Sequence, residues 1–115
     1  MIKVNWDVEE LVALIDIYRR SEGKSTEQIE TELVKLSVEL TNRANRLGIE
    51  HDEKFRNING MKMMFQNLVY IATDGRCGMS AASSSMRKVY GMLSTAPEVF
   101  DLILEEFIRR YTVKR

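Results

Sequence analysis

Apolar residues recur at helical spacing in five stretches of this 115-residue chain. Leu33, Leu36 and Leu40, for example, are three and four positions apart, which places them on one face of a helix. No stretch alternates convincingly between apolar and polar residues as a half-buried strand does, and no hairpin dipeptide is present. The pattern predicts an all-α protein, a compact bundle of about five helices that forms a single helical domain over residues 1–115.

Residues with capping chemistry predict where the helices begin. Asp7 with Glu10, and Ser25 with Gln28, have the spacing of a capping box, and Gly48 can end the second helix. The third helix is expected to stop at the glycine-rich segment TDGRCG, and the fourth is expected to end near residue 93. The caps expected for the last three helices are Asn57 or Asn59, then Ser80, then Thr95 with Glu98.

The last helix has more apolar surface than one buried face requires. In the segment EVFDLILEEFIRRY, apolar residues occupy several faces of the helix. We therefore expect this helix either to lie at the centre of the bundle or to share its apolar surface with a partner such as a second copy. Of the methionines, Met61 and Met64 are expected in the core and Met63 on the surface.

The sequence contains little catalytic chemistry. The one histidine, His51, and the one cysteine, Cys77, lie in separate connecting segments, and nothing in the sequence places them together as a nucleophilic pair. Zinc motifs such as CxxC and HExxH, and phosphate loops of the GxxxxGK type, are not present. We expect a protein that is not an enzyme and that has no metal site and no cofactor.

Composition indicates a protein of a reducing compartment. A single cysteine excludes an internal disulfide. The first residues, MIKVNWDVEE, lack the apolar core of a signal peptide, and no apolar run approaches the roughly 20 residues that a membrane-spanning helix needs. A cytoplasmic protein with no membrane segment is expected.

Charge is divided unevenly along the chain although the formal net charge is zero. Residues 1–53 contain seven Lys and Arg against twelve Asp and Glu, whereas residues 54–95 contain six Lys and Arg against Asp74 alone. A basic segment of this kind is typical of a protein with a polyanionic partner, provided that folding keeps its cations together.

The basic segment begins with DEKFRNINGMKMMFQN, at the expected start of the third helix. A helix start offers free N–H groups to a phosphate, and Arg56 and Asn57 could clamp a phosphate or bind a base edge there, with Lys62 one turn on. The alternative is structural: Arg56 could bridge an upstream carboxylate such as Asp52, and Asn57 could simply cap the helix.

A second group of candidate nucleic-acid contacts follows the glycine-rich segment. Hydroxyls and cations are the usual contacts to phosphate, and this part of the chain is rich in both. The alternative is that these cations are ordinary solvated surface. The candidates are Arg76, Ser80, Ser84, Arg87 and Lys88, with Ser83 beside them.

The segment FRNINGMKMMFQN resembles a motif of the small helical modules found ahead of HNH nuclease domains in bacterial restriction-type endonucleases and related defence proteins. The likeness extends to WDVEELVALIDIY and to TDGRCGMSAASS, so that it covers roughly residues 6–107. It implies a DNA-recognition or targeting role in which a separate domain does the cutting. No nuclease motif follows here, so the chain is either the recognition module of a longer protein or a stand-alone regulator or mobile-element protein.

The favoured hypothesis is therefore a non-catalytic, nucleic-acid-binding module for duplex DNA, related to restriction-type defence proteins. The alternative is a protein–protein interaction module, or a small inhibitor or regulator encoded by a mobile element or phage. Its partner would be a protein such as a nuclease or defence protein, or a second copy of the chain.

Overall fold

Residues 2–112 of the computed structural model are described, and they form five α-helices. The helices are α1 (Val8–Arg19), α2 (Thr26–Leu47), α3 (Ile58–Ala72), α4 (Ser84–Thr95) and α5 (Pro97–Tyr111). The all-α fold of about five helices is confirmed. Within the described part of the chain, no helix is both long enough and apolar enough to span a membrane.

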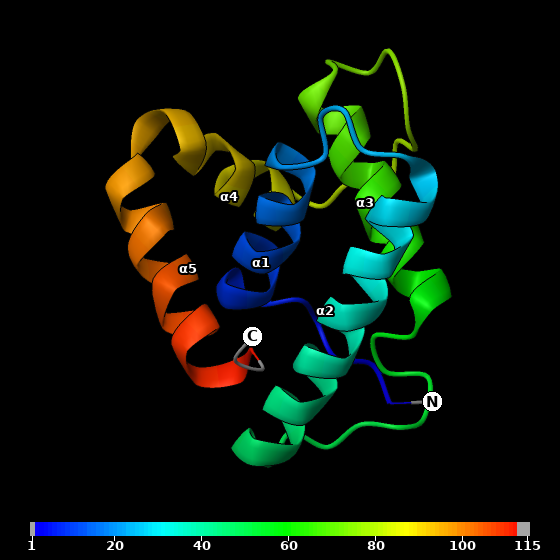
Figure 1. The fold of residues 1–115 in the computed structure, drawn as a ribbon, viewed down its shortest axis with the longest axis vertical. Helices are drawn as coiled ribbons and strands as arrows, with labels where there is room; N and C mark the ends of the chain where they lie inside the picture. Colours follow the sequence, from blue (N-terminus) through cyan, green and yellow to red (C-terminus); the bar gives the residue numbers. More distant parts are fainter. Residues whose placement is uncertain (1, 113–115) are drawn as a thin grey trace.

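Helix α1 is the centre of the bundle, with α2 and α5 flanking it in Figure 1. Every residue from Glu10 to Ile17 is buried, because the run Leu11–Ile15 is apolar on all sides of the helix and each of the other four helices packs against it. The expectation that the last helix could be central is wrong: α5 buries only Phe100 and Phe107 fully, and Leu102 on its outer side is 61% exposed.

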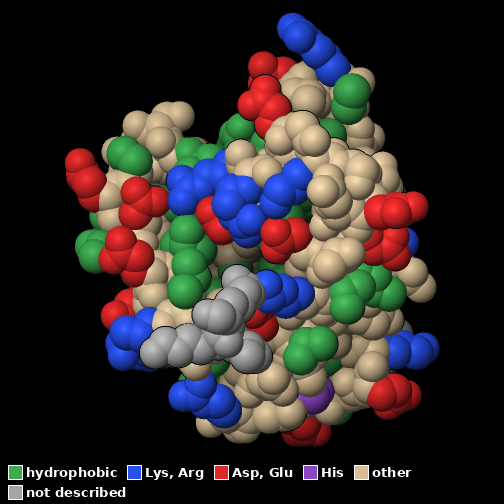
Figure 2. Space-filling view, in the orientation of Figure 1, with side chains coloured by type: hydrophobic (Ala, Val, Ile, Leu, Met, Phe, Trp, Pro, Cys, Tyr) green, Lys and Arg blue, Asp and Glu red, His purple; other side chains and the backbone are tan. Residues whose placement is uncertain are grey.

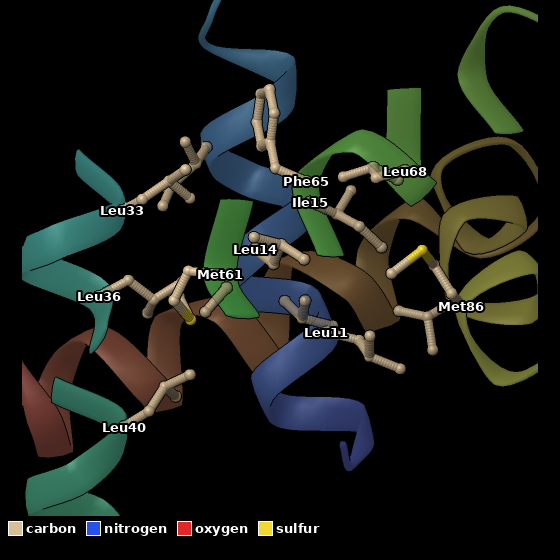
Figure 3. Packing of buried hydrophobic residues seen from close by; sticks show 14 of the residues in the cluster. Leu11, Leu14, Ile15, Leu33, Leu36, Leu40, Met61, Phe65, Leu68 and Met86 are labelled. Carbon is tan, nitrogen blue, oxygen red and sulfur yellow. The ribbon is translucent and has the colours of Figure 1, made fainter. Parts of the chain in front are cut away.

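The core is formed where α1, α2 and α3 converge, with Met86 contributed by α4 (Figure 3). Helix α5 adds Phe100 and Phe107 to the same core. Met61 is fully buried and Met64 packs against the core, whereas Met63 is exposed, as the helical spacing predicts. The labelled side chains in Figure 3 are Leu11, Leu14, Ile15, Leu33, Leu36, Leu40, Met61, Phe65, Leu68 and Met86.

Two of the expected helix starts are correct in every detail. Asp7 and Glu10, and Ser25 and Gln28, form reciprocal capping boxes, and Gly48 ends α2 in the left-handed conformation with φ of 70°. Of the two alternatives for α3, Asn57 is the cap and accepts a hydrogen bond from the Gly60 amide.

The other two starts differ from the sequence-based expectation. Helix α4 is capped by Ser83, not by Ser80, because Met79 is still hydrogen bonded to the Gln66 carbonyl of α3 and the chain reaches α4 only afterwards. Thr95 does not cap α5: it is the last residue of α4, and its hydroxyl donates to the Gly91 carbonyl. Helix α5 follows directly at Pro97, with no side-chain cap.

Candidate nucleic-acid interface

The amino end of α3 is joined to α1 by a buried ion pair between Arg56 and Glu10. The Arg56 Nε donates to Glu10 Oε2 at 2.7 Å and its Nη2 donates to Glu10 Oε1 at 2.8 Å. Both side chains are buried, at 7% and 2% exposure. This bidentate ion pair is shielded from water, and it links the connection between α2 and α3 to the first turn of α1.

The remaining surroundings of Arg56 hold it in place. Its guanidinium also donates to the carbonyls of Val4 and Asn5, at 3.1 and 3.2 Å. The central guanidinium carbon, Cζ, lies 4.6 Å from the ring centre of Trp6 and 4.3 Å from that of Phe55. Because the guanidinium makes all these contacts inside the protein, Arg56 is not available to a ligand. Arg56 therefore has the structural role that was the alternative to nucleic-acid binding. The carboxylate that it bridges is Glu10, however, and not Asp52.

Asn57 and Lys62 are also engaged within the protein. The Asn57 side chain caps α3, and Lys62 forms an ion pair with Glu30 of α2 at 3.1 Å, on the surface. The cations expected to gather at the amino end of α3 therefore do not form an open basic surface there. On the face shown in Figure 2, Lys and Arg side chains lie beside Asp and Glu side chains and do not occupy a region of their own.

Of the other five candidates, two lie on the connection between α3 and α4 and three lie on α4. All five are exposed, and no ion pair joins any of the three cations to a carboxylate within residues 2–112. We call this region the α4 basic surface. Its members are Arg76, Ser80, Ser84, Arg87 and Lys88.

The α3–α4 connection is held against α3 by its backbone. Gly75 donates to the Tyr70 carbonyl at 2.8 Å and Met79 donates to the Gln66 carbonyl at 3.1 Å. Gly78, between them, has φ of 85°, and a Cβ atom there would lie 2.3 Å from the Gln66 carbonyl oxygen. Only glycine allows this approach, so the glycine positions the part of the surface that carries Arg76 and Ser80.

Helix α4 presents the second part of this surface. Ser84 precedes Arg87 by three positions and Lys88 by four, which places the three side chains on neighbouring positions of one helix face. Ser84 is the first residue of α4, where the helix dipole adds a partial positive charge. Asp74 and Arg87 line the same shallow pocket, so Arg87 lies near the turn of the connection.

Four buried charged residues were not expected from the sequence, and one of them is Asp16 of α1. Glu10 was assigned only a capping role, and Glu39 and Arg43 of α2 were treated as part of the acidic half. Arg43 bridges Glu9 and Asp7 at the start of α1, at 2.6 and 2.8 Å. A signal was available for the two α2 residues, because each stands three positions after a buried leucine and therefore falls on or beside the apolar stripe.

His51 and Cys77 contact different parts of the fold. The His51 Nε2 lies 2.8 Å from the side-chain oxygen of Asn45, and its ring packs on Phe55. Cys77 is exposed on the α3–α4 connection, where its amide donates to the Thr73 hydroxyl. Across residues 2–112, no three His, Cys, Asp or Glu side chains are grouped in a way that could hold a metal ion.

Comparison of the chain with protein-family models, with curated proteins and with solved structures finds no match in any of the three.

Proposed function

We propose that this chain is a non-catalytic module that binds duplex DNA through the α4 basic surface. The observation that carries the proposal is that Arg76, Arg87 and Lys88 are all exposed and hold no ion pair within residues 2–112. The other cations of the basic segment that were candidates, Arg56 and Lys62, are paired with carboxylates. The contact surface we propose is thus smaller than the one expected from the sequence.

The chemistry of this surface suits a sugar–phosphate backbone. Most hydrogen bonds between proteins and DNA go to phosphate oxygens, and serine hydroxyls, arginine and lysine are their usual donors. Ser80 and Ser84 add neutral donors beside the cations, and the amino end of α4 adds a favourable dipole. The resemblance to the modules ahead of HNH nuclease domains supports the same ligand. A separate nuclease or defence protein would supply cutting, in the cytoplasm.

The test is the salt dependence of binding. The double variant Arg87→Gln/Lys88→Gln should bind a duplex more weakly at every sequence, because phosphate contacts carry no base information. The slope of log affinity against log salt should fall by about two, since each phosphate contact contributes roughly one. Fluorescence anisotropy with two unrelated labelled duplexes, measured over a salt series, gives both quantities.

The matched control is Arg109→Gln/Arg110→Gln. These adjacent arginines are exposed on α5, and both contact Glu106, so the variant removes the same formal charge from a different element. Affinity and salt slope should stay close to those of the unmodified chain. No duplex binding at low salt, or equal losses in the two double variants, would overturn the proposal.

The second candidate is a protein-interaction module, and the observation that favours it is the outer side of α5. Val99 and Leu102 are 48% and 61% exposed and lie one turn apart. An apolar face that the bundle does not cover suits a second copy of the chain, which would present the same face in return. A dimer whose mass is insensitive to salt supports this candidate, and a monomer at high concentration eliminates a second copy as the partner.

A further inference from the structure

A cavity of about 300 Å³ lies where α1, α2 and α5 meet. Helices α2 and α5 flank α1, as Figure 1 shows. The apolar part of the wall comes from all three helices, with Ile17, Leu36 and Phe107 among its residues. The polar part is formed by Asp16 of α1, by Arg20 directly after α1, and by Glu32, Lys35 and Glu39 of α2.

Glu39 is the unusual member of this wall. Its side chain is buried, with the residue only 7% exposed, and its Oε2 atom has no hydrogen-bond partner within residues 2–112. Burial, reinforced by the negative charge of Glu32, raises the pKa of the Glu39 carboxyl to about 7. A buried carboxylate oxygen without a donor is costly, and such groups normally have a partner.

The other carboxylates of the cavity have their own cations. Arg19 and Arg20 contact Asp16 at 3.0 and 2.9 Å. Glu32 is contacted by Arg20 and Lys24. Burial alone would raise the pKa of Glu32, but the hydrogen bonds and charges of Arg20 and Lys24 together lower it.

Lys35 and α5 do not supply the missing partner. Lys35 lies one turn before Glu39 on α2, but no ion pair joins the two side chains. The residues that α5 contributes to the wall, and Thr112 after it, carry no charge. Glu39 therefore faces the cavity as its one uncompensated carboxylate among the described residues.

We propose that this cavity binds a small organic cation, an ammonium or guanidinium group on a short apolar stem, with Glu39 as its counterion. The cationic head would pair with the Glu39 carboxylate, and the stem would lie against the apolar wall near Leu36 and Phe107. An anion would meet three carboxylates against the two cations Arg20 and Lys35, and a ligand without a donor would leave the Glu39 carboxylate unpaired. The volume is at the small end for ligand sites, which restricts the stem to a few carbon atoms.

Binding should depend on pH because the cation pairs only with ionised Glu39. With a carboxyl pKa of about 7, the ionised fraction rises about tenfold between pH 6 and pH 8. The affinity for a permanently charged ligand is expected to rise by about the same factor. The pKa of the Glu32 carboxyl is lowered, so this neighbouring charge persists over the range.

The experiment is an NMR titration of the full chain with butylamine and with butylguanidine, with butanol as the uncharged comparison. Saturable shifts of amides around the cavity, such as those of Ile17, Leu36 and Phe107, are expected with both cations at pH 8. At pH 6 the affinity should be about tenfold lower. Glu39→Gln should abolish the saturable shifts, because a neutral amide cannot act as the counterion.

The matched control is Glu27→Gln, which removes the same charge from an exposed position in the first turn of α2. This variant should bind like the unmodified chain. No saturable shift with either cation, equal binding of butanol, or equal binding by Glu39→Gln overturns the proposal. If Glu39→Gln does not fold, Lys35→Gln is the variant that tests the proposal. It removes a positive charge from the cavity wall, so tighter binding of butylamine supports the site. Unchanged or weaker binding overturns it.

Discussion

Single arginines of this protein have very different roles, and their partners show which role each has. Arg56 is buried against Glu10 and enclosed by two aromatic rings, and its own φ of 49° lies in the left-handed region that favours glycine. Such a backbone conformation is unfavourable for arginine and persists only where the surroundings hold it. Arg109, by contrast, is 65% exposed and pairs with Glu106 one turn away on α5.

Arg56→Met should therefore be far more destabilising than Arg109→Met. Removing Arg56 leaves the Glu10 carboxylate buried without its partner, and breaking a buried pair in this way costs about 3–5 kcal/mol. Breaking the exposed pair of Arg109 costs roughly 0–1 kcal/mol. Urea denaturation followed by circular dichroism measures both, and similar losses in the two variants would contradict the role assigned to Arg56.

At the scale of elements, capping residues predict the start of a helix well only where a single residue near that start has capping chemistry and the right distance to its partner in the first turn. The Asp7 and Ser25 boxes need no information beyond three neighbouring positions, and both form as expected. The start of α4 could not be chosen this way, because the segment SAASSS offers several serines with the same capping chemistry. The choice of Ser83 follows from how far the α3–α4 connection remains hydrogen bonded to α3.

Gly78→Ala should loosen this connection, whereas Gly91→Ala should not. At position 78 the new Cβ would lie 2.3 Å from the Gln66 carbonyl oxygen and φ is positive, so a loss of about 1–3 kcal/mol is expected. At position 91, inside α4, a Cβ meets nothing within 4 Å, so alanine should add about 0.5–1 kcal/mol of helix stability. Thermal unfolding measures both effects.

Hydrogen exchange separates a local effect from a global one. The Met79 amide, which donates to the Gln66 carbonyl, should exchange faster in Gly78→Ala than in Gly91→Ala. Unchanged protection of this amide in Gly78→Ala would show that Gly78 does not hold the connection against α3.

At the scale of the whole molecule, folding mixes charges that are separated along the chain. Arg56 of the basic segment meets Glu10 of the acidic segment, 46 positions away, and Lys62 meets Glu30. Among residues 2–112, the groups left without an ion pair include the cations of the α4 basic surface and, inside the bundle, the Glu39 carboxylate. The Glu39 carboxylate affects the stability of the whole fold, because burying it costs more free energy when it is ionised than when it is protonated.

Stability is expected to fall as pH rises through the range set by Glu39. The folded-state pKa is about 7 and the reference value is 4.5, so the folded state holds more protons between these limits and loses up to about 3 kcal/mol by pH 8. Glu39→Gln removes this pH-dependent contribution to the free energy of unfolding. The stability of Glu39→Gln relative to the unmodified chain, from urea denaturation at pH 5 to 8, should therefore increase with pH. A constant difference for Glu39→Gln would contradict the buried, ionisable state.

The sequence alone determined the all-α class, the existence of five helices, two capping boxes and the buried faces around Met61 and Leu36, because each depends on residues within a few positions of one another. The tertiary structure decided which helix lies at the centre, where Arg56 points and which cations stay free. The apolar run Leu11–Ile15 is a sign of a fully buried α1, but its neighbours become known only when the helices pack. The partners of Arg56, Lys62 and Arg43 lie 32 to 46 positions away in the sequence, and contacts at that distance follow from packing, which no local pattern encodes.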